Sequence, residues 1–420
     1  MPATPGQQTQ VPRPQPPEPT PVDAPGDPGA GPSGAGLVPA QLPRGAGLSG
    51  NTLPRWFLPA CLSGSLVLGL ALSLVITAGG FNPALFFILS ALLYLTSSYA
   101  ITRVRLNKRK ATDTLWRNAV YVAFILALIP LVWVIWSVTT TGLQGITNTG
   151  FFTEDMQGVS QSRERQIHEG EREMMGGVYH AIIGSLLVTL TAAIISVPIG
   201  LLTSIYLVEY ARGGTLSRGI TFFVDVMTGI PSIVAGLFGA AAVQTVLALG
   251  NAAGLWSHGS GDYRMGITAS VALSVLMIPV VVRTTEEMLR VVPNELREAS
   301  YALGVRKWRT ILKVVIPTAI SGIAAGVTLA IARVIGETAP ILLTAGMLTR
   351  VNWNMLEGAM MTLPVYIYQT FTHPTGVAEL EYLSHERAWG AALILIIVVM
   401  VLNLLGRLIA TIFAPKQAGR

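Results

Sequence analysis

The stretch WGAALILIIVVMVLNLLGRLIATIF, residues 389–413, contains one charged side chain, Arg407. It is long enough to cross a bilayer as a helix, which needs about 20 predominantly apolar residues. Seven other apolar runs of similar length precede it, so the sequence predicts an all-α integral membrane protein with about eight transmembrane helices. The eight predicted runs are residues 56–79, 82–102, 118–141, 179–208, 219–249, 265–282, 320–347 and 389–413.

The composition supports a membrane protein and excludes several other classes. Of the 420 residues, 51% are hydrophobic and only 12% are charged, about half of the roughly 25% charged residues of soluble domains. The net charge of +6 could indicate nucleic-acid binding, but the basic residues form short blocks between apolar runs, as the positive-inside rule describes. The single cysteine, Cys61, allows neither an intramolecular disulfide nor a cysteine-based metal site.

The distribution of basic residues predicts the orientation. With a cytoplasmic N-terminus, 21 of the 28 lysines and arginines lie on the cytoplasmic side, six lie outside and Arg333 falls within a span. We therefore expect a multi-pass protein with both termini in the cytoplasm.

Three regions follow from the composition along the chain. Residues 1–53 hold 13 of the 26 prolines and nine glycines, which predicts a disordered cytoplasmic tail because too little apolar surface is available for burial. Residues 54–114 form a predicted two-helix transmembrane extension. Residues 115–415 form the predicted core, with a long cytoplasmic connection at residues 283–317.

Signatures of catalysis are missing from the sequence. None of the five lysines follows a glycine, so the chain has no Walker A phosphate-binding loop. It also lacks the HExxH zinc motif and the GxSxG nucleophile motif. We therefore expect a non-catalytic chain with no metal or cofactor of its own.

The cytoplasmic connection contains two predicted short helices. The first covers about residues 294–303 and ends at Gly304, a residue type favoured beyond a helix C-terminus. The second is an amphipathic stretch around Trp308 that leads to Pro317 and the next span. Two such helices in an L form a protrusion suited to a groove on another protein, although composition alone also fits an ordinary interfacial loop.

The spacing within this connection resembles a known motif. The sequence EASYALGVRKWRTILKVVIP, residues 298–317, is similar to the EAA loop of ABC importer permeases, with Glu298, Ala299, Gly304 and Pro317 at the motif positions. Ser300 replaces the second alanine, and Val314 and Ile316 replace Ile and Leu. The resemblance implies a coupling helix that docks on an ATPase subunit.

Other segments resemble one permease family more closely. GIPSIVAG (229–236), RTTEEMLR (283–290), RVIGETAP (333–340) and TLPVYIY (362–368) are similar to PstA-type permeases of phosphate-specific ABC importers. The resemblance covers roughly residues 115–415 and implies a six-helix type I permease core in the plasma (inner) membrane. It also implies a PstC-type permease partner, two ATPase subunits that bind ATP and Mg, and an extracytoplasmic phosphate-binding protein.

Four charged residues are candidates for the substrate pathway. Arg333 and Glu337 lie one predicted helical turn apart in an apolar helix, where a charge is costly unless it faces a partner or a water-filled path. They could pair with each other, or the arginine could bind an anion through its planar fork of donors. Arg283 ends the preceding span and is either a pathway residue, as the resemblance implies, or a positive-inside anchor. Asp225 lies about two turns into its span, or only at its cytoplasmic interface.

Gly229 and Pro231 are predicted to break the helix at residues 219–249 and to act as a hinge or pathway lining.

The sequence thus favours a phosphate permease subunit. A permease for another oxyanion, such as sulfate or molybdate, remains an alternative, because such permeases share the EAA loop. A passive membrane channel or scaffold is the alternative from another class.

Overall fold

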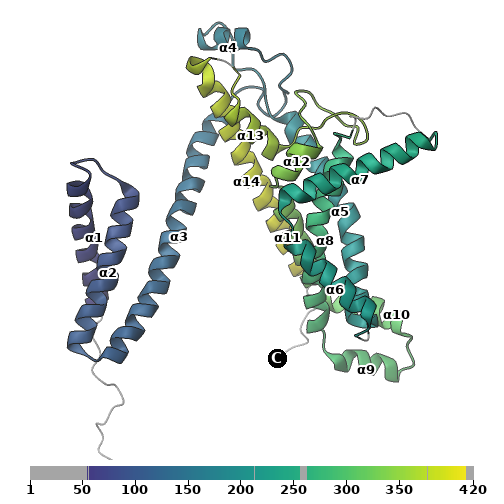
Figure 1. The fold of residues 1–420 in the computed structure, drawn as a ribbon, viewed down its shortest axis with the longest axis horizontal. Coiled ribbons are helices and arrows are strands. Elements are labelled where there is room, and N and C mark those ends of the chain that lie inside the picture. The colour runs from purple at the N-terminus through teal and green to yellow at the C-terminus, as the bar shows by residue number, and fades with distance from the viewer. Residues whose placement is uncertain (1–53, 55, 212, 256–262, 376, 413–420) are drawn as a thin grey trace, which may run out of the picture. The chain divides into compact units, whose positions relative to one another are not determined.

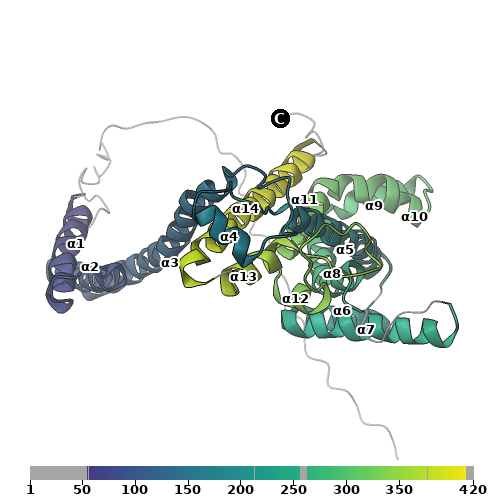
Figure 2. The same cartoon turned by 90° about the horizontal axis from the view of Figure 1, so that it is seen from above.

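The computed structural model describes residues 54–412 except 55, 212, 256–262 and 376, and all regular elements in this part are helical (Figures 1 and 2). The predicted disordered tail, residues 1–53, lies outside the described residues. The chain divides into two compact units, Met1–Val122 and Ala123–Arg420, and each is described by itself.

Unit 1 is a helical hairpin of α1 (Phe57–Ile76) and α2 (Pro83–Arg105), followed by the first turns of α3 (Lys108–Ile146). Gly69 allows the two hairpin helices to approach closely, because a Cβ there would lie 2.1 Å from the hydroxyl oxygen of Ser90. Small residues at such a contact are typical of helix packing in membranes. The predicted N-terminal hairpin is therefore present.

Unit 2 is a bundle of long helices with short helices at its ends. In Figure 1, α4 and α13 lie at one end of this unit, and α9 and α10 lie at the opposite end. Besides the rest of α3, its elements are α4 (Gln161–His168), α5 (Tyr179–Ile205) with a π-helical extension η1 (Tyr206–Tyr210), α6 (Thr215–Thr228), α7 (Ser232–Ala252), α8 (Gly266–Val291), α9 (Asn294–Ala302), α10 (Lys307–Thr310), a π-helical segment η2 (Ile311–Val315), α11 (Ile316–Val334), α12 (Ala339–Thr344), α13 (Leu363–Thr372), a short 3-10 helix η3 (Ala378–Leu380) and α14 (Glu381–Ile412).

Helix α8 lies at the centre of unit 2 and packs against both α5 and α11. Glycines permit these contacts. A Cβ at Gly200 of α5 would lie 2.6 Å from Val281, and one at Gly326 of α11 would lie 2.6 Å from Thr284. Because larger side chains would separate the helices, these positions fix α8 between its two neighbours.

Within the described residues, eight helices are long and apolar enough to cross a membrane, which confirms the predicted fold class. Two of the predicted runs had the wrong boundaries. The run at 219–249 is two helices, α6 and α7, separated at Gly229–Pro231, where the sequence predicted a break. The run at 320–347 instead belongs to a helical stretch that spans Lys307–Val334. The chain turns after Val334, and α12 starts again with Pro340 in its first turn, a position that favours a helix start over continuation.

The connection between α3 and α5 is fixed to α14 by a buried ion pair. Arg387 Nη1 donates to Glu164 Oε1 at 2.8 Å, and both side chains are fully buried. Arg387 Nη2 also donates to the carbonyl oxygen of Met175 at 2.9 Å. Burial raises the pKa of Glu164, and the hydrogen bond from Arg387 opposes that rise. The pair therefore holds α4 against the start of α14 at this end of unit 2.

Candidate functional site

A cavity of about 180 Å³ lies where three helix segments meet in unit 2. Breaks in regular helix create this space. The chain is interrupted at Gly229–Pro231 between α6 and α7, Pro279 lies within α8, and α11 ends at Val334. The lining residues are Met227, Thr228, Ile230 and Ser232 from the α6–α7 junction, Leu276, Pro279 and Val280 from α8, Ala330, Arg333 and Val334 from the end of α11, and Glu337 from the turn that follows it.

Arg333 is the only cation that lines this cavity. No ion pair or side-chain hydrogen bond joins it to another residue in the described part of the chain, so the expected alternative of an Arg333–Glu337 pair is not formed. Arg333 is exposed in this chain. A guanidinium has five N–H donors and no acceptor, so its unused donors suit an anion.

Glu337 lines the same cavity as Arg333, but not for the predicted reason. The sequence predicted both residues in one continuous helix, whereas α11 ends at Val334 and Glu337 lies in the turn before α12. Gly336 is exposed and weakens helix continuation, and the Glu337 backbone N–H closes the turn onto the carbonyl oxygen of Val334 at 3.1 Å. The cavity thus combines donors from Arg333 with a carboxylate that can accept a proton or a hydrogen bond.

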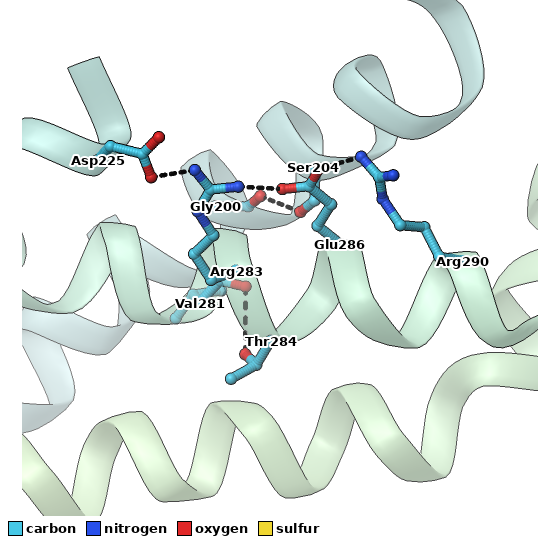
Figure 3. A network of polar contacts seen from close by, with 8 residues as sticks. All are labelled: Gly200, Ser204, Asp225, Val281, Arg283, Thr284, Glu286 and Arg290. Carbon is cyan, nitrogen blue, oxygen red and sulfur yellow. Dashed lines mark hydrogen bonds and ion pairs between the residues drawn. The ribbon is translucent and has the colours of Figure 1, made fainter. Parts of the chain in front are cut away.

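Charged residues of α6 and α8 form a network of ion pairs (Figure 3). Arg283 of α8 forms ion pairs with Asp225 of α6 and, through Nη1 at 2.9 Å, with Glu286 Oε2. Glu286 Oε1 accepts a hydrogen bond from Arg290 Nη2 at 2.5 Å. The structure therefore brings together the predicted residues Arg283 and Asp225, and it shows that Arg283 is already held by two carboxylates. We call these four residues the latch.

The latch lies one helical turn from the cavity on two helices at once. Thr228 lines the cavity and Asp225 is three residues earlier in α6, while Val280 lines the cavity and Arg283 is three residues later in α8. One turn corresponds to about 5 Å along a helix axis. Sequence reasoning did not single out Glu286, although its spacing from Arg283 and Arg290, at i−3 and i+4, is the one that brings helix side chains together.

The predicted helix at residues 294–303 is present as α9, which ends at Ala302, and Gly304 follows two residues later with a positive φ of 74°. Two leucines in and next to α9 face away from the rest of the chain, since Leu296 is 41% exposed and Leu303 is 83% exposed. Glu298 and Ala299 are exposed as well. Pro317 lies in the first turn of α11, directly after η2. The amphipathic stretch and the following span are therefore one continuous helical stretch, Lys307–Val334, and not two separate helices. The α9–α10 segment therefore offers an uncovered apolar surface.

Across the described residues, no group of three or more His, Cys, Asp or Glu side chains is arranged to hold a metal ion. The features that remain are eight helices suited to a membrane, a small cavity with one unpaired arginine, and a short helix with exposed apolar side chains at one end of the bundle. They define a class: a multi-pass membrane subunit of a transport system.

Comparison with known proteins identifies the family. Residues 196–419 match the family described as binding-protein-dependent transport system inner membrane component. The chain is 43% identical to phosphate transport system permease protein PstA 1 of Mycobacterium tuberculosis (strain H37Rv) over 310 residues, which cover 74% of this chain and 91% of that protein. It is 44% identical to PstA of Mycobacterium leprae, over 68% of this chain and 84% of that protein. The chain belongs to this transport family and, within it, to the PstA permeases.

Family membership decides between the classes that the sequence left open. The chain is an inner membrane component of a transport system, rather than a passive channel or scaffold. A chain from a bacterial ABC transporter involved in the import of the acidic polysaccharide alginate superposes with a TM-score of 0.45 at 14% identity, over 72% of this chain and 98% of that chain.

Proposed function

We propose that the chain is the permease subunit of an ATP-driven importer that moves inorganic phosphate into the cytoplasm. The main structural support is that Arg333 and Glu337 line one cavity without pairing to each other. The names of the relatives in Mycobacterium and Yersinia, all phosphate transport system permeases, support the same substrate.

The two side chains suit phosphate better than other tetrahedral oxyanions. The Arg333 guanidinium matches two phosphate oxygens with two parallel N–H donors. Hydrogen phosphate also carries an O–H group at neutral pH, which the Glu337 carboxylate can accept, whereas sulfate and molybdate carry no such proton. A carboxylate therefore favours phosphate over sulfate and molybdate, since it would face only acceptors on these anions.

The latch gives the pathway a closed state beyond the cavity. An anion that leaves Arg333 along α6 and α8 next meets Arg283, which is occupied by Asp225 and Glu286. Passage requires that these carboxylates separate from Arg283, so the anion replaces them as the partner of the guanidinium. The break at Gly229–Pro231 is the hinge that lets α6 move relative to α7. Each contact is weak enough to release the anion, as a transit site requires.

We assign the energy source to partner subunits. Two ATPase subunits bind ATP and Mg, and one of them docks on the exposed face of α9, with Glu298, Ala299, Gly304 and Pro317 in the coupling segment. A PstC-type permease completes the membrane portion, and an extracytoplasmic phosphate-binding protein delivers the anion. Both chain termini lie in the cytoplasm in this arrangement. ATP then shifts the permease between inward- and outward-facing states through its different affinity for the two states.

Labelled phosphate uptake in cells that lack this chain and every other phosphate importer tests the proposal. Wild type should restore uptake, Arg333→Gln should not, and excess sulfate or molybdate should not compete. A Glu337→Gln variant should keep part of the phosphate uptake, and excess sulfate should now inhibit this uptake. The reason is that the carboxamide N–H can donate a hydrogen bond to sulfate, which has no O–H group of its own. Restored uptake of sulfate or molybdate in place of phosphate would contradict the phosphate assignment and leave the family assignment intact.

A further inference from the structure

One arginine of α9 points back into the protein and joins three helical elements. Arg297 Nε and Nη2 donate to Glu209 Oε1 in η1, at 3.0 and 2.9 Å. Nη2 also donates to the carbonyl oxygen of Leu289 at 2.8 Å, and Nη1 donates to the carbonyl oxygen of Val292 at 2.6 Å. The Arg297 and Glu209 side chains are only 12% and 5% exposed. One guanidinium thus connects α9 with the ends of α5 and α8.

The acceptors are of a kind that a helix end leaves unsatisfied. The last four carbonyl groups of a helix have no partner within it, and Leu289 is in the last turn of α8. A cation at this end also interacts favourably with the helix dipole. On the other side, Glu209 is held a second time, because Lys307 Nζ donates to its carbonyl oxygen and lies 5.0 Å from the ring centre of Tyr210. The ends of α5 and α8 and the starts of α9 and α10 therefore meet at one point.

The rest of α9 has few attachments to the bundle. Ser300 is its only buried residue, and the hydroxyl groups of Ser300 and Thr310 lie 2.8 Å apart, which ties α9 to α10. Arg297 and Ser300, three residues apart, form the inner face of the helix, while Leu296 and Leu303 belong to the exposed face. Arg297 is therefore the side chain of α9 whose hydrogen bonds reach both η1 and the end of α8.

We propose that Arg297 and Glu209 are positioning residues that form a rigid joint, through which movement of α9 is transmitted to α5 and α8. α8 carries Arg283 and part of the cavity lining, and the end of α5 carries Glu209, so displacement of the joint displaces the latch and the cavity. The proposal rests on the proposed function in that it needs an ATPase on the exposed face of α9. Loss of the joint leaves that face intact, so it uncouples ATP hydrolysis from transport without preventing assembly.

The test compares variants in the complete complex, reconstituted in proteoliposomes with its ATPase, partner permease and binding protein. Arg297→Met keeps the aliphatic stem and removes every donor. It should copurify normally with the ATPase and raise the ATP hydrolysed per phosphate imported by roughly 10-fold, a size typical for one residue that carries coupling between sites. Arg297→Lys should show a smaller rise, because an ammonium group cannot reach all of the acceptors with the geometry of a fork. Arg218→Gln, an exposed cation of α6 outside the coupling segment, is the matched control.

A second measurement does not depend on the substrate. An environment-sensitive fluorophore at position 202 of α5, where Leu202 is 68% exposed, is attached to a Leu202→Cys variant in a Cys61→Ser background. ATP should change its emission in the otherwise wild-type complex and with Arg218→Gln, and should have little effect with Arg297→Met. An unchanged response and an unchanged ATP-to-phosphate ratio in Arg297→Met would overturn the joint, as would loss of ATPase subunits from that variant. A wild-type complex that imports no phosphate but shows the ATP response would contradict the proposed substrate alone.

Discussion

Two arginines of unit 2, Arg333 on α11 and Arg283 on α8, have different surroundings. Arg333 lines a cavity and has no acidic partner in the described part of the chain, whereas Arg283 is held by Asp225 and Glu286. Both have unpaired or exchangeable donors for an anion. The first is ready to bind, and the second binds only when its present partners leave.

The exposure of the latch indicates how easily it opens. Glu286 is 8% exposed, but Arg283 is 32% exposed and Asp225 is 57% exposed. Ion pairs with this much solvent access contribute only about 0–1 kcal/mol, because water competes for both charges. The fully buried Arg387–Glu164 pair at the other end of unit 2 is different, since separation there leaves charges without water. The latch therefore suits a contact that opens in every transport cycle, and the buried pair suits a permanent one.

The largest effect should follow from removal of the unpaired arginine. Arg333→Gln replaces a charged fork with one neutral amide and loses about two charge-assisted hydrogen bonds, each contributing roughly 1.5–3 kcal/mol. Phosphate import should fall by roughly 100-fold or more, the rate equivalent of about 3 kcal/mol. The measurement is initial uptake by proteoliposomes at saturating ATP. Arg333→Lys should recover a minority of the rate, because it restores the charge without the fork.

Assembly provides the control for this substitution. Arg333 is exposed in this chain, so the Gln variant should fold and copurify with its partners in normal amounts. Normal uptake by Arg333→Gln would remove the cavity from the pathway and leave the latch as the candidate anion site.

The sequence predicted the cavity less completely than the fold. Apolar run length and the Gly229–Pro231 break are local properties, so the eight spans and the α6–α7 interruption could be predicted. The end of α11 could not, because the apolar run continues past Val334 and hydropathy does not register the turn around Gly336. Glu337 consequently reaches the cavity from a turn instead of from a helix.

Contacts between helices were beyond sequence reasoning. The Arg297–Glu209 pair joins residues 88 positions apart, and no periodicity relates them. Arg283 and Asp225 were both predicted as pathway candidates, but their mutual ion pair depends on how α6 lies against α8. The spacing of Glu286 from Arg283 and Arg290 was visible in the sequence. Its role in a network between two helices became clear only from the structure, in which Asp225 of α6 also pairs with Arg283.

The second largest effect should come from the centre of the latch. Glu286 accepts from both Arg283 and Arg290 and is the most buried of the four residues. Glu286→Gln leaves both arginines without that charged partner, so phosphate import should fall by roughly 10-fold, equivalent to about 1.4 kcal/mol. Uptake and copurification measured together separate the two possible causes. A loss of import in proportion to lost complex would show that Glu286 serves folding only.

A smaller effect is expected at the exposed side of the latch. Asp225→Asn weakens one of the two ion pairs of Arg283, and the exposure of Asp225 limits the change to about 1 kcal/mol or less. The substitution weakens an ion pair that is present only in the closed state, so the free energy of the closed state rises and that of the open state does not. The latch should therefore open more often. We expect ATP hydrolysis in the absence of the binding protein to rise by about 2- to 5-fold. A fall in this basal hydrolysis would mean that the Arg283–Asp225 pair belongs to the active state instead.

The smallest effect should come from Arg290→Gln, which provides the matched control for the latch. Arg290 is 67% exposed and contacts the carboxylate oxygen of Glu286 that Arg283 does not use. An exposed i, i+4 pair contributes about 0.3–0.5 kcal/mol, so import and basal hydrolysis should stay within about 2-fold of wild type. If Arg290→Gln instead reduced import as much as Glu286→Gln does, the ion pair important for transport would be Arg290–Glu286. The contrast between a paired Arg283 and an unpaired Arg333 would then have no bearing on transport.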